Sequence, residues 1–214
     1  MFVELIDLLR CPRPHEDTWL VASADETVGR HIVRGTLGCP VCAAEYPIDA
    51  AVVDFGAAAD AGLAPDAEEE DDVLRVAALL GLAGGGGTVA LGGTWQRVAA
   101  PLAEMAGVRV LLLDPVRGEP LREEVSAVRG GGGLPVASGA LRGVALDART
   151  ADAARLTAAV RALGPGGRLV APAAAALPDD VAELARDARH WVAERVGAAA
   201  SRPVVLSRSR RPTR

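Results

Sequence analysis

The chain reads Thr88-Val-Ala-Leu-Gly92, then Gly93-Thr-Trp-Gln-Arg-Val-Ala-Ala-Pro-Leu-Ala-Glu-Met-Ala-Gly107, then Val108-Arg-Val-Leu-Leu-Leu-Asp114. The first and third segments are short apolar runs, which predict buried strands, and the apolar spacing over residues 95–106 predicts a helix. A strand, a helix and a second strand in this order predict two parallel strands joined by a crossover helix. Residues 88–114 therefore place the chain among α/β proteins.

The same alternation extends over residues 73–208. Helices are predicted over residues 73–82, 151–163 and 179–189, and strands over 125–128, 143–146 and 168–171. Residues 191–196 and 204–207 predict a closing antiparallel hairpin. Apolar strands that alternate with helices indicate a doubly wound, mostly parallel α/β sheet, and we expect seven strands.

Composition limits the classes of function. Half of the 214 residues are hydrophobic and only 3% are aromatic, which predicts an aliphatic core. The length allows one ordinary domain and a small one. The net charge of −5 disfavours general nucleic-acid binding. All 23 basic residues are arginines, a bias typical of GC-rich codon usage, so no single glycine or alanine is strong evidence of function.

The N-terminal stretch carries Glu4 and Asp7 among its apolar residues, which argues against a signal peptide. No apolar run reaches the length needed to span a membrane. Reduced thiols acting as metal ligands suit a cytoplasmic location, which we therefore expect.

The chain has three cysteines, and they lie in Cys11-Pro-Arg-Pro-His15 and Cys39-Pro-Val-Cys42. Two cysteines separated by two residues can reach one metal ion from a tight turn. Together with Cys11 and His15 they complete a tetrahedral Cys3His set for zinc. A closed set of four ligands leaves no position for water, so the predicted zinc is structural.

Three other interpretations of these residues remain open. They are three unrelated thiols and a surface histidine, a disulfide that leaves one cysteine over, or a zinc site in which His31 replaces His15. His31 ranks lower because it begins an alternating run over residues 31–37 that predicts a strand.

Residues 1–55 are predicted to form the first unit, with a short amphipathic helix over 2–9, strands near 19–22 and 31–37, and an extended run over 46–55. The segments Leu8-Leu-Arg-Cys-Pro12 and Gly38-Cys-Pro-Val-Cys-Ala-Ala-Glu-Tyr-Pro-Ile48 resemble the small zinc-ribbon family that includes the activator subunit shared by several tRNA, rRNA and protein methyltransferases. The family usually has a second Cys-x-x-Cys where this chain has Pro14 and His15. The resemblance implies a ribbon that packs on a methyltransferase.

Residues 73–208 resemble the class I S-adenosylmethionine-dependent methyltransferases. The segment Leu163-Gly-Pro-Gly-Gly-Arg-Leu-Val170 is similar to the turn that enters the fifth strand of that family, and residues 134–147 are similar to the segment entering the fourth. The resemblance implies a cofactor loop at Gly92 and Gly93, with Asp114 on the ribose hydroxyls. Alternatively, Asp114 caps the turn before Pro115.

The predicted cofactor loop departs from the family pattern. Its second and third glycines are replaced by Thr94 and Gln96, Trp95 adds bulk between them, and the usual acid before the loop is Ala90. The acid expected near the adenine falls among the glycines of residues 130–133. Since glycine gives the backbone room to approach a ligand, we expect no measurable S-adenosylmethionine binding.

No catalytic residue is assigned. Asp147 at the end of a predicted strand is a candidate, but a helix N-cap explains it better, and His190 is more typical of a surface or hairpin residue. Residues 84–87 are four glycines with no following Lys-Ser or Lys-Thr, so they are interpreted as a loop rather than a phosphate cradle.

The predicted organisation is a zinc ribbon (1–55), an acidic flexible linker (56–72), a methyltransferase-like domain (73–208) and a basic tail (209–214). We expect replacing Cys39 with serine to unfold residues 1–55 alone.

The sequence favours a non-catalytic binding or assembly protein with a protein partner. The alternative is an active S-adenosylmethionine-dependent methyltransferase with a divergent loop. A nucleic-acid-binding ribbon is opposed by the net charge and by the expected lack of exposed aromatic residues.

Overall fold

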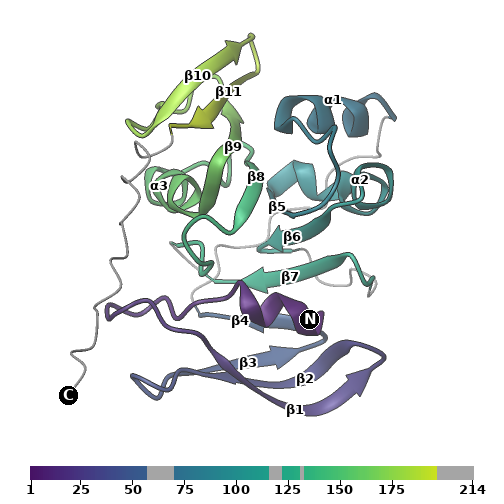
Figure 1. The fold of residues 1–214 in the computed structure, drawn as a ribbon, viewed down its shortest axis with the longest axis vertical. Helices are drawn as coiled ribbons and strands as arrows, with labels where there is room; N and C mark the ends of the chain where they lie inside the picture. Colours follow the sequence, from purple (N-terminus) through teal and green to yellow (C-terminus); the bar gives the residue numbers. More distant parts are fainter. Residues whose placement is uncertain (57–69, 116–121, 131–132, 197–214) are drawn as a thin grey trace, which may run out of the picture.

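A computed structural model describes residues 1–56, 70–115, 122–130 and 133–196 of the chain. These residues form one continuous eleven-stranded sheet in the order β1-β2-β3-β4-β7-β6-β5-β8-β9-β11-β10 (Figure 1). The α/β fold class is confirmed, but the expected count of seven strands is wrong because the strands of the first unit join the same sheet. None of the helices in the described ranges is long and apolar enough to cross a membrane.

The elements follow the chain in this order. The strands are β1 (Val21–Val28), β2 (His31–Gly38), β3 (Glu45–Asp49), β4 (Val52–Asp54), β5 (Thr88–Gly92), β6 (Arg109–Leu113), β7 (Val125–Arg129), β8 (Leu141–Ala145), β9 (Leu163–Pro172), β10 (Val181–Arg186) and β11 (His190–Arg195). The α-helices are α1 (Glu70–Leu80), α2 (Ala99–Ala106) and α3 (Ala153–Ala162), and the 3-10 helices are η1 (Val3–Asp7) and η2 (Gly93–Val98).

The centre of the sheet is doubly wound, as predicted. Strands β7, β6, β5, β8 and β9 are all parallel. The chain runs outward from β5 to β7 and then crosses back to β8 and β9, so the direction of winding reverses between β5 and β8. In open α/β sheets this switch point is where ligands bind, outside the carboxyl ends of the strands.

Two expectations about the ends of the chain are corrected. Residues 179–189 do not form a helix, because β10 pairs antiparallel with β11 in that region. Val181, Leu184 and Ala185 have helical spacing, but the pairing with β11 decides the conformation, and only Val181 is buried in the resulting strand. The predicted strand over 204–207 lies outside the described residues. The N-terminal amphipathic helix is a 3-10 helix, η1.

The sheet is covered differently on its two faces. Helices α1 and α2 lie on one face and α3 lies on the other (Figure 1). Leu80 and Leu102 pack in a core with Leu91 on the first face. On the second face, Leu156 of α3 shares a core with Leu9 and with buried residues of β2, β3 and β4. The N-terminal unit therefore covers the part of that face where a doubly wound fold would otherwise need a helix.

Direct backbone contacts join the two predicted units. Strand β4 pairs parallel with β7, and the Phe55 N–H donates to the Arg129 carbonyl at 2.6 Å. A second backbone bond joins the two units before β1, where the Arg10 N–H donates to the Pro135 carbonyl at 2.9 Å. The N-terminal unit and the doubly wound region thus share one sheet and one core.

The β3–β4 hairpin suggests a stabilising substitution. Its two-residue loop consists of Ala50 and Ala51, whose φ angles are 47° and 63°. Each alanine in this left-handed conformation costs about 1 kcal/mol, and asparagine is favoured there. Ala50 is exposed, so Ala50→Asn should raise the free energy of unfolding by about 0.5–1 kcal/mol in urea titrations. Ala24→Asn, on exposed β1, is the control and should give no gain; equal stability of the two variants would contradict the hairpin geometry.

Candidate metal centre and cofactor crevice

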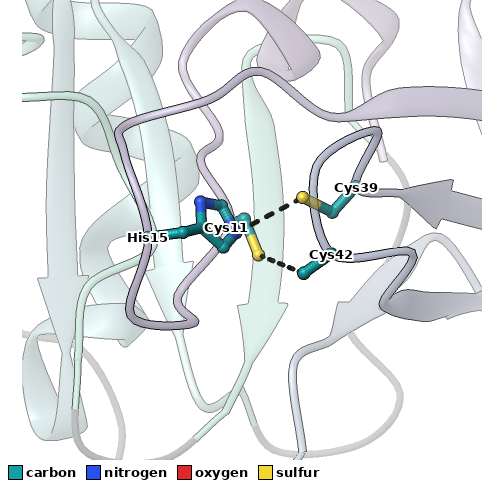
Figure 2. A group of neighbouring side chains, drawn as sticks. All are labelled: Cys11, His15, Cys39 and Cys42. Carbon is teal, nitrogen blue, oxygen red and sulfur yellow. Dashed lines mark hydrogen bonds between the residues drawn. The ribbon is translucent and has the colours of Figure 1, made fainter.

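The three cysteines and His15 come together between the η1–β1 loop and the β2–β3 turn (Figure 2). Their ligand atoms all lie within 4.8 Å of one another. The Cys11 and Cys42 sulfurs are 3.7 Å apart, and His15 Nε2 is 3.4 Å from the Cys39 sulfur. Sequence analysis predicted these four residues as one set, and the fold brings all four together.

A tight knuckle turn places two of the sulfurs. The Ala43 N–H donates to the Cys39 carbonyl at 3.0 Å, and the Cys39 N–H donates to the Ala44 carbonyl at 2.8 Å. Ala43 adopts φ 54°, a left-handed conformation that reverses the chain after Cys42. Cys39 is buried, whereas Cys11 and Cys42 are half-buried.

The spacing of the ligand atoms matches tetrahedral zinc. Zn–S bonds of about 2.3 Å and Zn–N bonds of about 2.0–2.1 Å place two sulfurs about 3.8 Å apart, and a sulfur and a nitrogen about 3.6 Å apart. The observed separations of 3.7 and 3.4 Å lie close to these values. The donor set and its geometry therefore fit a structural zinc ion.

The surroundings of the thiols shift the pKa of Cys11 and that of Cys42 in opposite directions. Burial would raise the pKa of Cys11, but hydrogen bonds, first among them one with the Tyr46 hydroxyl at 3.1 Å, outweigh it and lower that pKa. The Ala44 N–H lowers the pKa of Cys42, but burial and the neighbouring thiols have the larger combined effect and raise it. Because thiolates are the ligand form, a bound cation would favour ionisation of all three.

His31, the alternative ligand, lies outside this cluster. Its Nε2 is 2.9 Å from the Arg122 carbonyl, and its ring packs against Phe2 with 5.5 Å between centroids. His31 is thus a buried histidine that joins β2 to the segment before β7.

The predicted cofactor residues reach the switch point of the sheet. Gly92 ends β5, Gly93 follows it, and Asp114 follows β6. Asp147 lies after β8, on the other side of the switch point. All four residues are therefore at the carboxyl edge where a cofactor would bind.

The space at Gly93 is occupied by Asp147. Gly93 has φ 64°, and a Cβ atom added to it would lie only 2.0–2.1 Å from the Asp147 carboxyl group. That carboxylate accepts hydrogen bonds from the Thr94 N–H at 2.9 Å and from the Thr150 hydroxyl at 2.9 Å. Burial would raise the pKa of Asp147, but these bonds and the charge of Arg149 lower it. In this chain, glycine at position 93 makes room for a carboxylate.

Asp114 is also engaged within the protein. Its carboxylate forms an ion pair with Arg155 at 2.6 Å, and the two side chains are only 8% and 6% exposed. The other carboxylate oxygen accepts the Gly130 N–H at 2.9 Å. The cavity beside this pair offers about 10 Å³ to the centre of a water molecule, roughly the space one water requires. Both oxygens of the Asp114 carboxylate are thus engaged within the protein.

Two further side chains close the loop after β5. The Trp95 indole is 6% exposed, and its N–H donates to the Leu146 carbonyl at 3.3 Å. The Gln96 amide donates to the Leu113 carbonyl at 2.6 Å. Trp95 and Gln96, which stand where the family pattern has a glycine-rich loop, therefore tie the loop to the ends of β6 and β8.

The remaining candidates have structural contacts. Asp147 caps the turn at residues 147–150, but the N-cap of α3 is Asp152, which accepts the Arg155 N–H at 2.9 Å. His190 begins β11, and its ring lies 5.1 Å from that of Trp95. Burial, assisted by the charge of Arg75, lowers the pKa of His190.

Sequence analysis missed Arg155. The spacing of Arg155, Ala159 and Ala162 could have indicated its burial, because residues so spaced lie on one stripe of a helix. All three are buried in α3. A charged residue within a buried stripe needs a charged partner.

No protein-family model and no curated protein matches this chain. Among solved structures, it is similar to the antibiotic-resistance methyltransferase Kmr, with 18% identity, coverage of 59% of this chain and 93% of that chain, and a TM-score of 0.41. For a geranyl diphosphate C-methyltransferase from Streptomyces coelicolor A3(2) the identity is 19%, the coverages are 46% and 44%, and the TM-score is 0.35.

A third similar structure is a complex between the Trm112 methyltransferase activator of Haloferax volcanii and a methyltransferase, with 19% identity, coverages of 50% and 61%, and a TM-score of 0.35. In the geranyl diphosphate enzyme the match spans less than half of that chain. The TM-scores of these three structures are all below 0.5.

Proposed function

We propose that this chain is a non-catalytic binding or assembly protein, in which a zinc ribbon is fused to a degenerate methyltransferase-like domain. The observation that carries the proposal is the buried Asp114–Arg155 ion pair. It uses the carboxylate that a cofactor ribose would need.

The residues at the switch point do not fit S-adenosylmethionine. A cofactor would have to displace Arg155 from Asp114 and the Asp147 carboxylate from Gly93. Breaking a buried ion pair costs about 3–5 kcal/mol, which corresponds to a loss of at least a hundredfold in affinity. No methyl-transfer step is therefore assigned to this chain.

The zinc ion has a structural role in this proposal. Cys11, His15, Cys39 and Cys42 supply four ligands, and a complete tetrahedral set leaves no position for a substrate or a catalytic water. Zinc would hold the η1–β1 loop against the β2–β3 turn.

The ribbon already has a partner within the chain. Its β4 edge pairs with β7, and its apolar inner face shares a core with α3. This arrangement supports an intramolecular version of the ribbon–methyltransferase contact that the family resemblance implies. A separate protein partner would have to use the surfaces that this contact leaves free.

The alternative function is an active S-adenosylmethionine-dependent methyltransferase. One observation favours it: Gly92, Gly93 and Asp114 lie at the carboxyl edge of the switch point, where the cofactor of such an enzyme would bind.

Titration calorimetry with S-adenosylmethionine distinguishes the two functions. We expect no binding heat at micromolar concentrations, because the side chains of the protein occupy the crevice. Asp114→Ala tests the site, and Asp180→Ala, which removes an exposed acid, is the matched control. A micromolar dissociation constant that is lost in Asp114→Ala and kept in Asp180→Ala would establish the enzyme and refute the scaffold.

A further inference from the structure

Strand β1 forms one edge of the sheet and is open to solvent on its outer side. Seven of its eight residues are exposed and Ala22 is half-buried. An edge strand carries unpaired N–H and carbonyl groups, and proteins usually protect such edges with charges, bulges or very short strands.

The second half of β1 has this protection. Asp25 and Glu26 introduce charges, and the pairing register with β2 shifts on both sides of Glu26. Glu26 also forms an ion pair with Arg34 at 3.4 Å. An additional strand could not continue regularly past this point.

The first half of β1, Val21–Ala24, lacks this protection, whereas Trp19 before it is already paired with Arg10 by an antiparallel bridge. Residues 18–24 read Thr-Trp-Leu-Val-Ala-Ser-Ala, without a charge, and the pairing from Val21↔Gly38 to Ala24↔Gly35 is regular. Trp19, just before the strand, is 67% exposed and Val21 is 64% exposed. The expectation that the ribbon has no exposed aromatic residue is therefore wrong.

The opposite edge of the sheet, β10, is as exposed as β1 but shorter, and its pairing is less regular than that of Val21–Ala24. It is a six-residue strand with a register shift between Glu183 and Ala185. Glu183 and Arg186 form an ion pair across it at 2.7 Å. Leu184, 49% exposed, is its large apolar side chain facing solvent.

Charge indicates what would bind the open stretch of β1. Glu16 and Asp17 precede it and Asp25 and Glu26 follow it, and residues 1–55 hold nine acidic residues against four arginines. Asp17 and Glu26 are paired with Arg10 and Arg34, which leaves Glu16 and Asp25 to attract a basic partner. The Trp19 ring already accepts a cation, since the Arg10 guanidinium lies 5.2 Å from its centroid. An arginine or lysine of a partner would be attracted to both features.

We propose that residues 21–24 at the β1 edge bind an extended, basic segment of a partner protein as an added strand. Backbone hydrogen bonds would supply affinity, and contacts with Trp19, Val21 and the flanking acids would supply specificity. A second copy of this chain is disfavoured, because antiparallel pairing of two β1 strands would bring Glu16 and Asp17 of one copy near Asp25 and Glu26 of the other. This inference rests on the proposed assembly function and names its binding surface.

The test uses the peptide acetyl-Arg-Thr-Val-Thr-Val-Arg-amide and tryptophan fluorescence of the full chain. Trp95 and Trp191 are 6% and 0% exposed, so Trp19 supplies the solvent-exposed emission. We expect a saturable blue shift with the basic peptide. Binding should be at least tenfold weaker when glutamate replaces both arginines, and also when alternate backbone nitrogens along one edge of the peptide are methylated.

Matched protein variants locate the site. Val21→Arg should weaken binding at least tenfold, whereas Leu184→Arg, the same change on β10, should leave it unaltered.

Absence of a saturable shift at millimolar peptide, insensitivity to N-methylation, or equal weakening by the two variants would overturn the proposal. A dimer that is detected by sedimentation and that Val21→Arg dissociates would also overturn the proposal, since a second copy of the chain would then occupy the β1 edge. If calorimetry detects binding of S-adenosylmethionine, the proposed assembly function is refuted. If S-adenosylmethionine does not bind and the peptide does not bind either, the non-catalytic function stands and only the proposed binding surface on β1 is refuted.

Discussion

Cys39→Ser is expected to abolish zinc binding and to unfold the whole described fold in one transition. A structural zinc site contributes about 10 kcal/mol or more, whereas an entire domain is stable by about 5–15 kcal/mol. The loss is not expected to stay within residues 1–55, because Leu9 and Leu37 of the ribbon share a core with Leu156 and Val128. The structure thus replaces the expectation that the second unit would stand alone.

Three measurements check this result. Elemental analysis should find one zinc per chain in the reduced wild-type protein and none in Cys39→Ser. Thermal denaturation by circular dichroism should show a single, strongly lowered midpoint, and hydrogen exchange should lose protection in β7 and α3 together with the ribbon. Val41→Ser, an exposed change in the same knuckle, is the control and should keep zinc and stability. Full protection of β5, β6 and β8 in zinc-free protein would show instead that the ribbon unfolds independently.

Arg155→Met is expected to destabilise the protein by about 3–5 kcal/mol, because it leaves the Asp114 carboxylate buried without its partner. Asp114 has φ 53°, a conformation that asparagine tolerates. The double variant Asp114→Asn with Arg155→Met should therefore recover a large part of the loss, since no buried charge remains.

Urea denaturation of the two single variants and the double variant gives the coupling energy of this pair. Arg161→Met is a useful comparison, because Arg161 lies on the same helix and its side chain donates to the Val136 and Leu134 carbonyls rather than to a carboxylate. If Arg155→Met costs no more than about 1 kcal/mol, the ion pair is not the buried interaction that fills the crevice.

Local patterns in the sequence were sufficient for the parallel core. Apolar runs such as residues 88–92 and 108–113 are buried strands because continuous apolar segments can only be accommodated in a sheet covered on both faces. The four zinc ligand candidates were also predicted as a set, since their spacing within two short turns limits how far apart they can lie. The same alternation of strands and helices predicted that Gly92, Asp114 and Asp147 lie at the ends of their strands, next to the switch point.

The contacts between distant segments were decided only by the tertiary structure. The pairing of β4 with β7 joins residues more than 70 positions apart, and no local pattern specifies which edge a strand will meet. Residues 179–189 carried an ambiguous apolar pattern, and the neighbouring β11 edge determined that they form a strand. The role of Asp114 depended on Arg155, 41 positions away. An aspartate at the end of a strand is compatible with ribose binding or with an ion pair, and only the packing of α3 against the sheet brings in the arginine that decides between them.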